Sequence, residues 1–487
     1  MYRATCLLPL SLLISACPDD VDPATNPTTL QFTVNDNDPS NGPTNDPSND
    51  STVNVPTSDE PTSTSSPTAT EADPTGGTPD PTMSDSETDA PGCQGECGLV
   101  DILFVVDNSG SMSEEQADLV AAVPRMVDQL RADGRDVNVL ITTTDFGHPL
   151  CTSFYKDGYS PAKGAPTTTP CTERIPHFTA YGGQPSHPEV CTSVCPVGTH
   201  ADGPFVHFNG DDDNVVDAAN QDDPVVEALR CMIPQGIDGC GMESPLETML
   251  QALDPGKDWN QGPAPFLRDG STVAIVLLSD ETDCSTKDYA YFDPSKKNDP
   301  MYNQYWEDLP GMPGVKGDPT SAVCWNGGMN CDDADQDGTY ESCVPADNGV
   351  LQPVERYTNY LAEILIGAKN HRIVMLALTG VPTVTQHSAS PPYEPVAGGV
   401  LSLEYRTWEQ SDILPGDPKP PAQKEYEFGI APGCSNAAVG QAIPPGRIQR
   451  VCESLDQPGE VHCCIESVCS ENLDPAMDCL TGMIGLQ

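Results

Sequence analysis

Four apolar segments stand out along the chain: residues 101–106, 137–141, 273–278 and 373–378. Each has the length of a strand and consists mainly of aliphatic side chains, with no regular alternation of polar and apolar positions. Unbroken runs of this kind are typical of strands that are buried on both faces. We therefore expect these segments to form the interior of one sheet.

Helical patterns lie between these strands. Ser113 and Gln116 have the spacing of a capping box at the start of a helix over residues 113–132, and Pro124 should kink that helix. Further apolar positions recur at helical spacing in three stretches: 224–232, 245–253 and 353–369. Strands that alternate with helices predict an α/β fold with an open, mostly parallel sheet and helices on both faces.

Two long polar stretches, 147–223 and 284–350, interrupt this pattern and carry several cysteines. Structureless loops of that length are rare, so we expect disulfide-braced insertions in a domain that extends over residues 93–433. The tail, 434–487, carries six cysteines and two helical patterns. We expect it to form a cysteine-rich cap on the same domain.

The first 16 residues have the pattern of an export signal. Arg3 precedes an apolar run at 7–14 that is too short to span a membrane. The following tetrapeptide, ISAC, resembles the bacterial lipobox, and this resemblance implies cleavage before Cys17 and acylation of that cysteine, for example with palmitate. The mature lipoprotein would then be anchored in the bacterial cell envelope, at the outer membrane or the cell surface. An ordinary signal peptide with an incidental cysteine is the alternative.

Residues 17–92 have the composition of a disordered tether. From 18 to 92 there is no Lys, Arg or Cys, and Asp, Pro, Thr, Ser and Asn dominate. Such a segment cannot bury enough apolar surface to offset its conformational entropy. The whole chain has 73 acidic against 22 basic residues, a net charge of −51. This charge argues against a nucleic-acid partner and favours sites for divalent cations.

The cysteine count predicts disulfides. Of 20 cysteines, 18 remain once Cys6 in the signal and Cys17 are set aside, and an even number in an exported chain favours pairing. The neighbours Cys463 and Cys464 should pair with two different partners. Zinc is the alternative at one place, where two cysteines lie between two histidines: His187, Cys191, Cys195 and His200.

Candidate metal ligands follow the first strand directly. Asp107, Ser109 and Ser111 come at its carboxyl end, which is where open α/β sheets bind their ligands. Carboxylate and hydroxyl oxygens at alternate positions of a tight loop can point at one cation. Magnesium, manganese and calcium suit such ligands best.

The Asp-x-Ser-x-Ser pattern between a buried strand and a helix resembles the metal-ion-dependent adhesion site (MIDAS) of von Willebrand factor type A (vWA) domains. The resemblance covers about residues 99–379. It implies that Ser109 and Ser111 ligate the cation, that Asp107 acts through water, and that a later aspartate and a threonine loop complete the site. Asp280, which follows another buried strand, matches the later aspartate, and Glu281 and Asp283 stand beside it.

The threonine of that pattern is missing. Before the helix at 245–253, Glu243 or Ser244 stands where the resemblance expects it. A glutamate ligand would partly neutralise the cation and weaken its attraction for an acidic partner. The alternative is that Glu243 only caps the following helix.

A second acidic loop lies in the later insertion. Asp333, Asp335 and Asp337 alternate before Gly338, as in the first half of a calcium loop of EF-hand type. Position twelve of that pattern is Val344, so the bidentate acid is absent. We expect a truncated calcium loop clamped by cysteines 331 and 343, with a solvated acidic turn as the alternative.

No catalytic motif accompanies these metal patterns. The chain lacks a Gly-x-Ser-x-Gly elbow, a phosphate-binding glycine loop and a His-Glu-x-x-His pair, so we expect a binding protein and not an enzyme. The resemblance implies binding of a protein or surface ligand, acidic in the adhesive case, through the cation. The alternatives are a structural envelope protein with loop-bracing calcium sites and an exported metal-dependent hydrolase.

Overall fold

The computed structural model describes residues 98–210, 212–219, 223–333 and 335–486, which belong to one compact unit. The expected signal peptide, the acylation site Cys17 and the tether lie outside the described residues. Within the described ranges, no helix is both long enough and apolar enough to cross a membrane.

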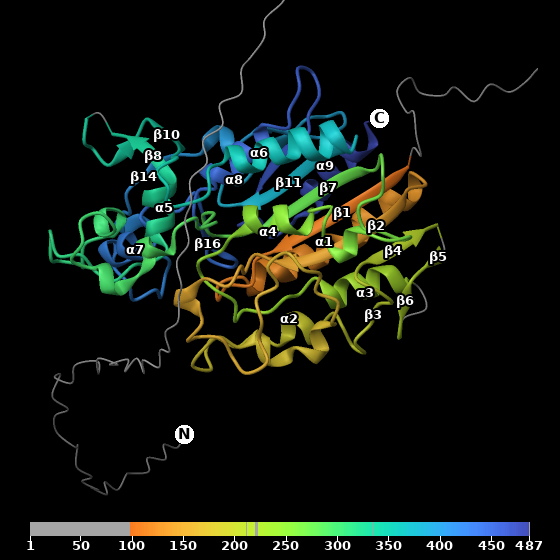
Figure 1. The fold of residues 1–487 in the computed structure, drawn as a ribbon, viewed down its shortest axis with the longest axis horizontal. Helices are drawn as coiled ribbons and strands as arrows, with labels where there is room; N and C mark the ends of the chain where they lie inside the picture. The colour runs from red at the N-terminus through yellow and green to blue at the C-terminus, as the bar shows by residue number, and fades with distance from the viewer. Residues whose placement is uncertain (1–97, 211, 220–222, 334, 487) are drawn as a thin grey trace, which may run out of the picture. The chain divides into compact units, whose positions relative to one another are not determined.

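The centre of the molecule is a seven-stranded sheet with the order β17-β11-β7-β1-β2-β4-β5 (Figure 1). Five strands are parallel: β1 Leu99–Val106, β2 Asp136–Thr143, β7 Thr272–Leu278, β11 Arg372–Thr379 and β17 Cys463–Ser467. The short strands β4 (Val206–Asn209) and β5 (Asp212–Asp213) extend one edge in antiparallel pairing. The four predicted strands are confirmed and lie side by side, so the prediction of a mostly parallel sheet is confirmed.

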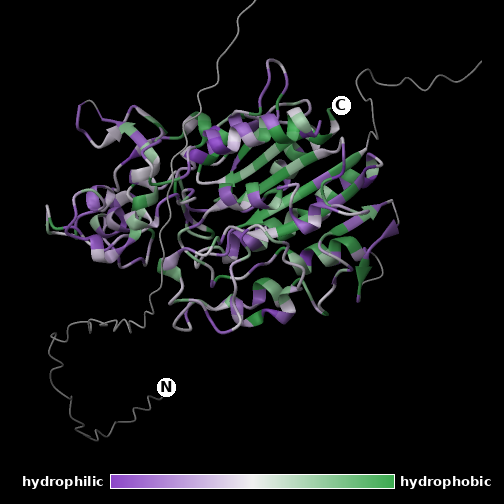
Figure 2. Cartoon of the chain, in the orientation of Figure 1, coloured by the Kyte–Doolittle hydropathy of each residue, from purple (hydrophilic) through white to green (hydrophobic). Residues whose placement is uncertain are grey.

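Helices cover both faces of the sheet. Ile102 and Phe104 of β1 pack on the side of α1 (Ser113–Ala132), α3 (Pro224–Met232) and α9 (Asp474–Gly485). Leu103 and Val105 point to the other side, where the cover consists of α4 Pro245–Ala252, α6 Glu355–Asn359 with its π-helical continuation Tyr360–Ala368, and α8 Gly446–Glu453. Figure 2 shows the strands as the most apolar part of the fold. Burial on both faces explains the unbroken apolar runs.

The smaller elements lie mainly in the insertions and the tail. The short strands are β3 His200–Ala201, β6 Val215–Val216, β8 Met329–Asp332, β9 Thr339–Tyr340, β10 Ser342–Pro345, β12 Gln386–His387, β13 Pro395–Ala397, β14 Tyr405–Arg406, β15 Cys434–Asn436 and β16 Gly440–Ala442. The remaining α-helices of the described residues are α2 Glu189–Thr192, α5 Ala322–Gly328 and α7 Pro421–Phe428.

The predicted capping box at the start of α1 is wrong. Met112 holds the N-cap position, and the Ser113 hydroxyl donates to the Glu114 side chain. The Gln116 amide instead donates to the carbonyls of Asp107 and Gly236, both at 2.8 Å. Tertiary contacts therefore use the side chain that the local pattern assigned to the cap. The helix continues through Pro124 to Ala132.

Disulfides brace the insertions and the tail, as expected. The pairs are Cys151–Cys240, Cys171–Cys191, Cys195–Cys231, Cys284–Cys324, Cys331–Cys343, Cys434–Cys469, Cys452–Cys463 and Cys464–Cys479. Cys463 and Cys464 pair with different partners, which confirms that prediction. Cys191 and Cys195 are both in disulfides, so the zinc alternative at these residues is wrong.

The tail is built into the main sheet. Its strand β17 pairs with β11, and its last helix, α9, packs against α1. Arg125 of α1 and Asp478 of α9 form a hydrogen-bonded ion pair across this contact. The tail and the α/β core therefore share one sheet and one hydrophobic core.

Candidate metal centre

Three loops meet at the carboxyl end of the central strands. The loop after β1 provides Asp107, Ser109 and Ser111, the segment before α4 provides Glu243, and the loop after β7 provides Asp280. Ser279, at the end of β7, donates a 2.6 Å hydrogen bond to Asp107 Oδ2 and so joins the first and third loops. The carboxylates of Glu243 and Asp280 both lie near enough to Asp107 to repel it. The structure thus brings all five predicted residues together.

Asp107 is fully buried at the centre of this group. Its Oδ1 accepts a 2.8 Å hydrogen bond from the backbone N–H of Ser109, and its Oδ2 accepts from Ser279. Burial raises the pKa of Asp107 to about 6, although these hydrogen bonds oppose the shift. The backbone of the loop therefore fixes the carboxylate before any ligand arrives.

The two serines connect the buried acids to solvent. Their hydroxyl oxygens are 3.4 Å apart, with Ser109 buried and Ser111 exposed. Gly110 between them and Gly241 across the loop are exposed as well. Ser111 and these two glycines are therefore the solvent-exposed residues of the loops around the buried acids.

Glu243 points into the cluster and does not cap α4. The Thr144 hydroxyl donates a hydrogen bond to Glu243 Oε2. The other carboxylate oxygen, Glu243 Oε1, is buried without a hydrogen-bond partner among the described residues. The N-terminus of α4 is instead capped by the loop after β7, where Asp283 Oδ1 and Ser285 Oγ accept hydrogen bonds from backbone N–H groups of the helix. Burial raises the pKa of Glu243 well above its usual value, and repulsion from Asp107 adds to this.

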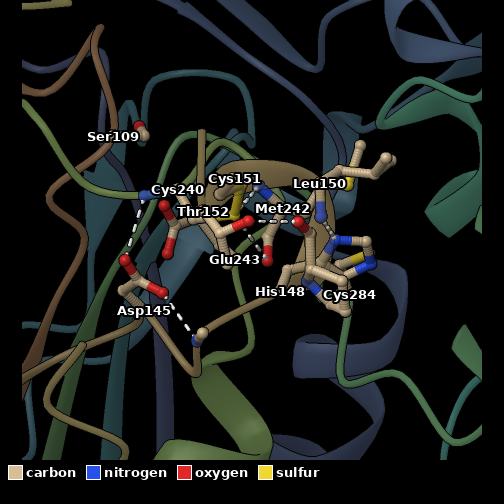
Figure 3. Close-up of a disulfide and its surroundings, with 12 residues drawn as sticks. Ser109, Asp145, His148, Leu150, Cys151, Thr152, Cys240, Met242, Glu243 and Cys284 are labelled. Atoms are coloured by element: carbon tan, nitrogen blue, oxygen red, sulfur yellow. Dashed lines mark hydrogen bonds between the residues drawn. A yellow bond between two sulfur atoms is a disulfide. The ribbon is translucent and has the colours of Figure 1, made fainter. Parts of the chain in front are cut away.

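Ser244, the other candidate for the threonine position, is turned away. Its hydroxyl donates to the carbonyl of Cys284 at 3.1 Å. Figure 3 shows Glu243 beside the Cys151–Cys240 disulfide, together with Asp145 and Ser109. Of the two candidates that the sequence left open, Glu243 is the one in the site.

Asp280 is almost fully buried beside Asp107. Burial raises its pKa to about 7, repulsion from Asp107 adds to the shift, and a hydrogen bond from Ser111 opposes it. In the part of the chain that the structure describes, Asp280 Oδ1 has no hydrogen-bond partner. Its backbone carbonyl accepts from the N–H of Ile443 at 2.7 Å, so the tail holds this loop in place.

Two further acids belong to the cluster and were not assigned to it from the sequence. Glu115 is 2 % exposed, and its pKa is raised well above the usual value by burial and by the nearby Asp280. Glu281 is partly buried, and burial and Asp280 shift its pKa in the same direction. Glu115 lies in the first turn of α1. Exposed acids are common there because they interact favourably with the helix dipole, so nothing in the sequence marked Glu115 as a buried residue of the site.

Asp145 and Asp283 lie next to the cluster but have other partners. Asp145 accepts hydrogen bonds from the hydroxyls of Tyr155 and Tyr159 at 3.0 and 2.6 Å, and these rings belong to the first insertion. Asp283 forms an ion pair with Arg447. Both acids serve to pack the insertion and the tail around the site.

The cluster has the chemistry of a site for a hard divalent cation. Among the described residues, no Lys or Arg is a main charge neighbour of the five acids: Asp107, Glu115, Glu243, Asp280 and Glu281. Buried carboxylates without a positive partner are costly. A cation between carboxylate and serine oxygens would remove that cost, and such oxygens are the ligands that Mg²⁺, Mn²⁺ and Ca²⁺ prefer. The residues therefore fit the metal that the sequence predicts.

The three aspartates of the predicted calcium loop also lie close together. One carboxylate oxygen from each of Asp333, Asp335 and Asp337 lies within 4.8 Å of the others. The backbone N–H groups of Asp337 and Gly338 donate to Asp333 at 3.2 Å, and the Cys331–Cys343 disulfide closes the loop. Asp335 and Asp337 are exposed, so this loop is open to solvent.

No protein-family model, no curated protein and no solved structure matches this chain.

Proposed function

We propose that this protein is a bacterial envelope lipoprotein with a vWA-type domain that binds a protein or surface ligand through a divalent cation. The cation would be held by the cluster at the carboxyl end of the sheet, from Asp107, Ser109, Ser111, Glu243 and Asp280. The observation that carries the proposal is that, among the described residues, one buried carboxylate oxygen of Glu243 and one of Asp280 have no hydrogen-bond partner, although both acids lie next to Asp107 and Asp280 lies next to the exposed Ser111. Buried carboxylate oxygens without partners are expected where a cation binds, and an exposed residue beside them is expected where a partner's ligand atom reaches that cation.

Each of these residues would have its own role in binding the cation. Ser109 and Ser111 present neutral hydroxyl oxygens to the cation, and Asp107 and Asp280 balance its charge and orient its waters. A bound divalent cation would supply an open coordination position for an oxygen of the partner. Gly110, Ser111 and Gly241 are exposed, so an acidic side chain of a partner would approach the cation from their side.

The predicted export route agrees with the rest of the fold. The cysteine pairs connect segments up to 89 residues apart, as Cys151–Cys240 does, and such disulfides persist in oxidising compartments. Acylation of Cys17 would anchor the chain at the outer membrane or cell surface, and the acidic tether would hold the domain away from the membrane.

A pull-down from envelope extracts tests the adhesive function. We expect the full chain to retain a partner in Ca²⁺, Mg²⁺ or Mn²⁺ and to lose it in chelator. Asp107→Asn should abolish retention while the protein stays folded by circular dichroism. Asp128→Asn removes an exposed acid from α1 and is the matched control, which should bind as the unaltered protein does.

A structural role is the second candidate, and Glu243 favours it. A glutamate in place of a threonine adds an anionic ligand from within the domain and lowers the attraction of the cation for an acidic partner. In that case the cation only braces the three loops. Asp107→Asn would then lower the melting temperature, and neither the unaltered protein nor this variant would retain a partner in the presence of any of the three metals.

A further inference from the structure

The second insertion, residues 284–350, forms a pocket of its own. A cavity of about 290 Å³ lies between the segment 304–307, Lys316, helix α5 and strands β8 and β9. Figure 1 shows α5 and β8 near β10 and β14, to one side of the main sheet. Small-molecule sites begin at about 300 Å³, so this cavity has the size for one compact ligand.

Four aromatic residues line this pocket. Trp306 and Trp325 are 1 % and 3 % exposed, and the Trp306 indole N–H donates to the carbonyl of Tyr291 at 2.6 Å. These two rings are therefore held by the fold. Tyr305 and Tyr340 also line the pocket and are only partly buried, so a ligand can reach them. Tyrosine offers such a ligand a flat apolar ring face and a hydroxyl at its tip.

Two side chains of the pocket have oxygens that can accept further hydrogen bonds. The Asn326 amide donates to Glu307 Oε1 at 2.6 Å, which leaves Oε2 of that carboxylate for a ligand. The Gln304 amide nitrogen donates to the carbonyl of Met301 at 2.7 Å, which leaves its own carbonyl oxygen. Both planar groups can accept from hydroxyls of a ligand.

Lys316 adds a donor of opposite charge to the same pocket. Its Nζ donates to the carbonyl of Trp306 at 2.6 Å and lies 3.2 Å from Asp308 Oδ1. An ammonium group has three donors, so one remains for a ligand.

The two charges decide which class of ligand fits. A cation in the pocket would be repelled by Lys316, and an anion would be repelled by Glu307. A neutral ligand with several hydroxyls avoids both penalties, because a hydroxyl can donate to the carboxylate and accept from the ammonium group. The partly exposed tyrosine rings also favour a ligand with an apolar face. A sugar ring combines these properties, since its hydroxyls lie around the edge and its C–H groups form a face.

We propose that this pocket binds a saccharide through one neutral sugar ring. The ring packs on Tyr305 and Tyr340, and its hydroxyls bond to Glu307, Gln304 and Lys316. Among the described residues, Glu307 is the one acid that lines the pocket, so binding should need no metal. Sugar binding would thus be a second activity of the chain, independent of the proposed metal centre.

Saturation-transfer NMR on the full chain tests this activity. The probes are glucose, galactose, mannose, rhamnose and N-acetylglucosamine, with tetramethylammonium as a cationic comparison. We expect transfer to at least one of these sugars in the presence of chelator.

Two pocket variants and a matched control locate the site. Tyr305→Ala removes a ring contact and Glu307→Gln removes a charged acceptor, so each should weaken binding of that sugar by about tenfold. Tyr181→Ala removes a tyrosine of the first insertion that is 61 % exposed, and it should bind the sugar as the unaltered protein does.

Several results would overturn the sugar site. Transfer to none of the five sugars would do so, as would transfer to tetramethylammonium alone. Binding that is unchanged in both pocket variants would place the sugar elsewhere, and binding that chelator abolishes would place it at a metal ion. If Tyr305→Ala fails to fold, Glu307→Gln decides, because it keeps the size of the side chain. The metal-dependent pull-down is a separate measurement, so either proposal can fail without the other.

Discussion

Arg447 on α8 and Asp283 in the loop after β7 form an ion pair in which both side chains are fully buried, with 2.9 Å between Nε and Oδ2. Asp283 also accepts a hydrogen bond from the backbone N–H of Leu246 in the first turn of α4. Arg447 donates a further one to the carbonyl of Gln352 at 2.6 Å. One pair therefore ties the tail to the two loops that supply Glu243 and Asp280.

Arg447→Met should destabilise the protein by about 3–5 kcal/mol, because it leaves the Asp283 carboxylate buried without its partner. Denaturant unfolding at neutral pH measures this loss. The matched control is Arg125→Met, which removes the partly exposed Arg125–Asp478 pair and should cost at most about 1 kcal/mol. Equal losses in the two variants would show that the buried pair has no special role.

Removal of metal should lower the melting temperature of the protein. A cation that binds only the folded chain stabilises it by about 2.7 kcal/mol when its concentration is 100 times the dissociation constant. We expect chelator to remove this stabilisation and excess Ca²⁺ or Mg²⁺ to restore it. In Glu243→Gln the difference between metal and chelator should shrink, because a charged ligand is lost. If chelator does not change the melting temperature of the unaltered protein, this result would contradict a bound cation that stabilises the fold.

Much of the sheet was predictable because its central strands are buried on both faces. The runs at 101–106 and 273–278 need no knowledge of their neighbours to be recognised as buried strands. The edge strands are different: β4 and β5 are short and lie in a polar insertion, and β17 contains Glu466 and two cysteines. Their pairing depends on long-range contacts that local hydrophobicity does not encode.

The candidate site was also predictable only in part. Asp107, Ser109, Ser111 and Asp280 were found because each follows a buried strand at a fixed spacing, and parallel strands bring their carboxyl ends together. Glu115 was missed, since its burial depends on Gly440 in the tail. Gln116 was assigned to a local cap, but in the fold its side chain binds the carbonyl of Gly236. Residues whose role is set by distant segments are those that the sequence alone misassigned.

Acidification should weaken the fold through His148. Burial lowers its pKa to about 4, against about 6.5 for an unfolded histidine. Between these values the unfolded chain binds the extra proton, so stability is fully present above pH 6.5 and is lost as the pH falls toward 4, by up to about 3 kcal/mol. His148→Phe keeps the edge-on ring contacts with Tyr289 and Phe292 and removes the titration. Unfolding free energies at pH 7 and pH 5 should therefore differ less in this variant, and an unchanged difference would exclude His148 as the cause.

The exposed loop at Asp333, Asp335 and Asp337 should bind calcium without supporting the fold. Its acids are open to water, so they carry no cost of burial that a cation must remove, and the Cys331–Cys343 disulfide holds the loop in either state. Calorimetry should show that replacing the three aspartates by asparagine removes a weak Ca²⁺ site, while the melting temperature in metal changes by less than about 2 °C, the shift expected from under 1 kcal/mol in a domain of this size. A large drop in melting temperature would mean that this loop, and not the buried cluster, is where metal stabilises the protein.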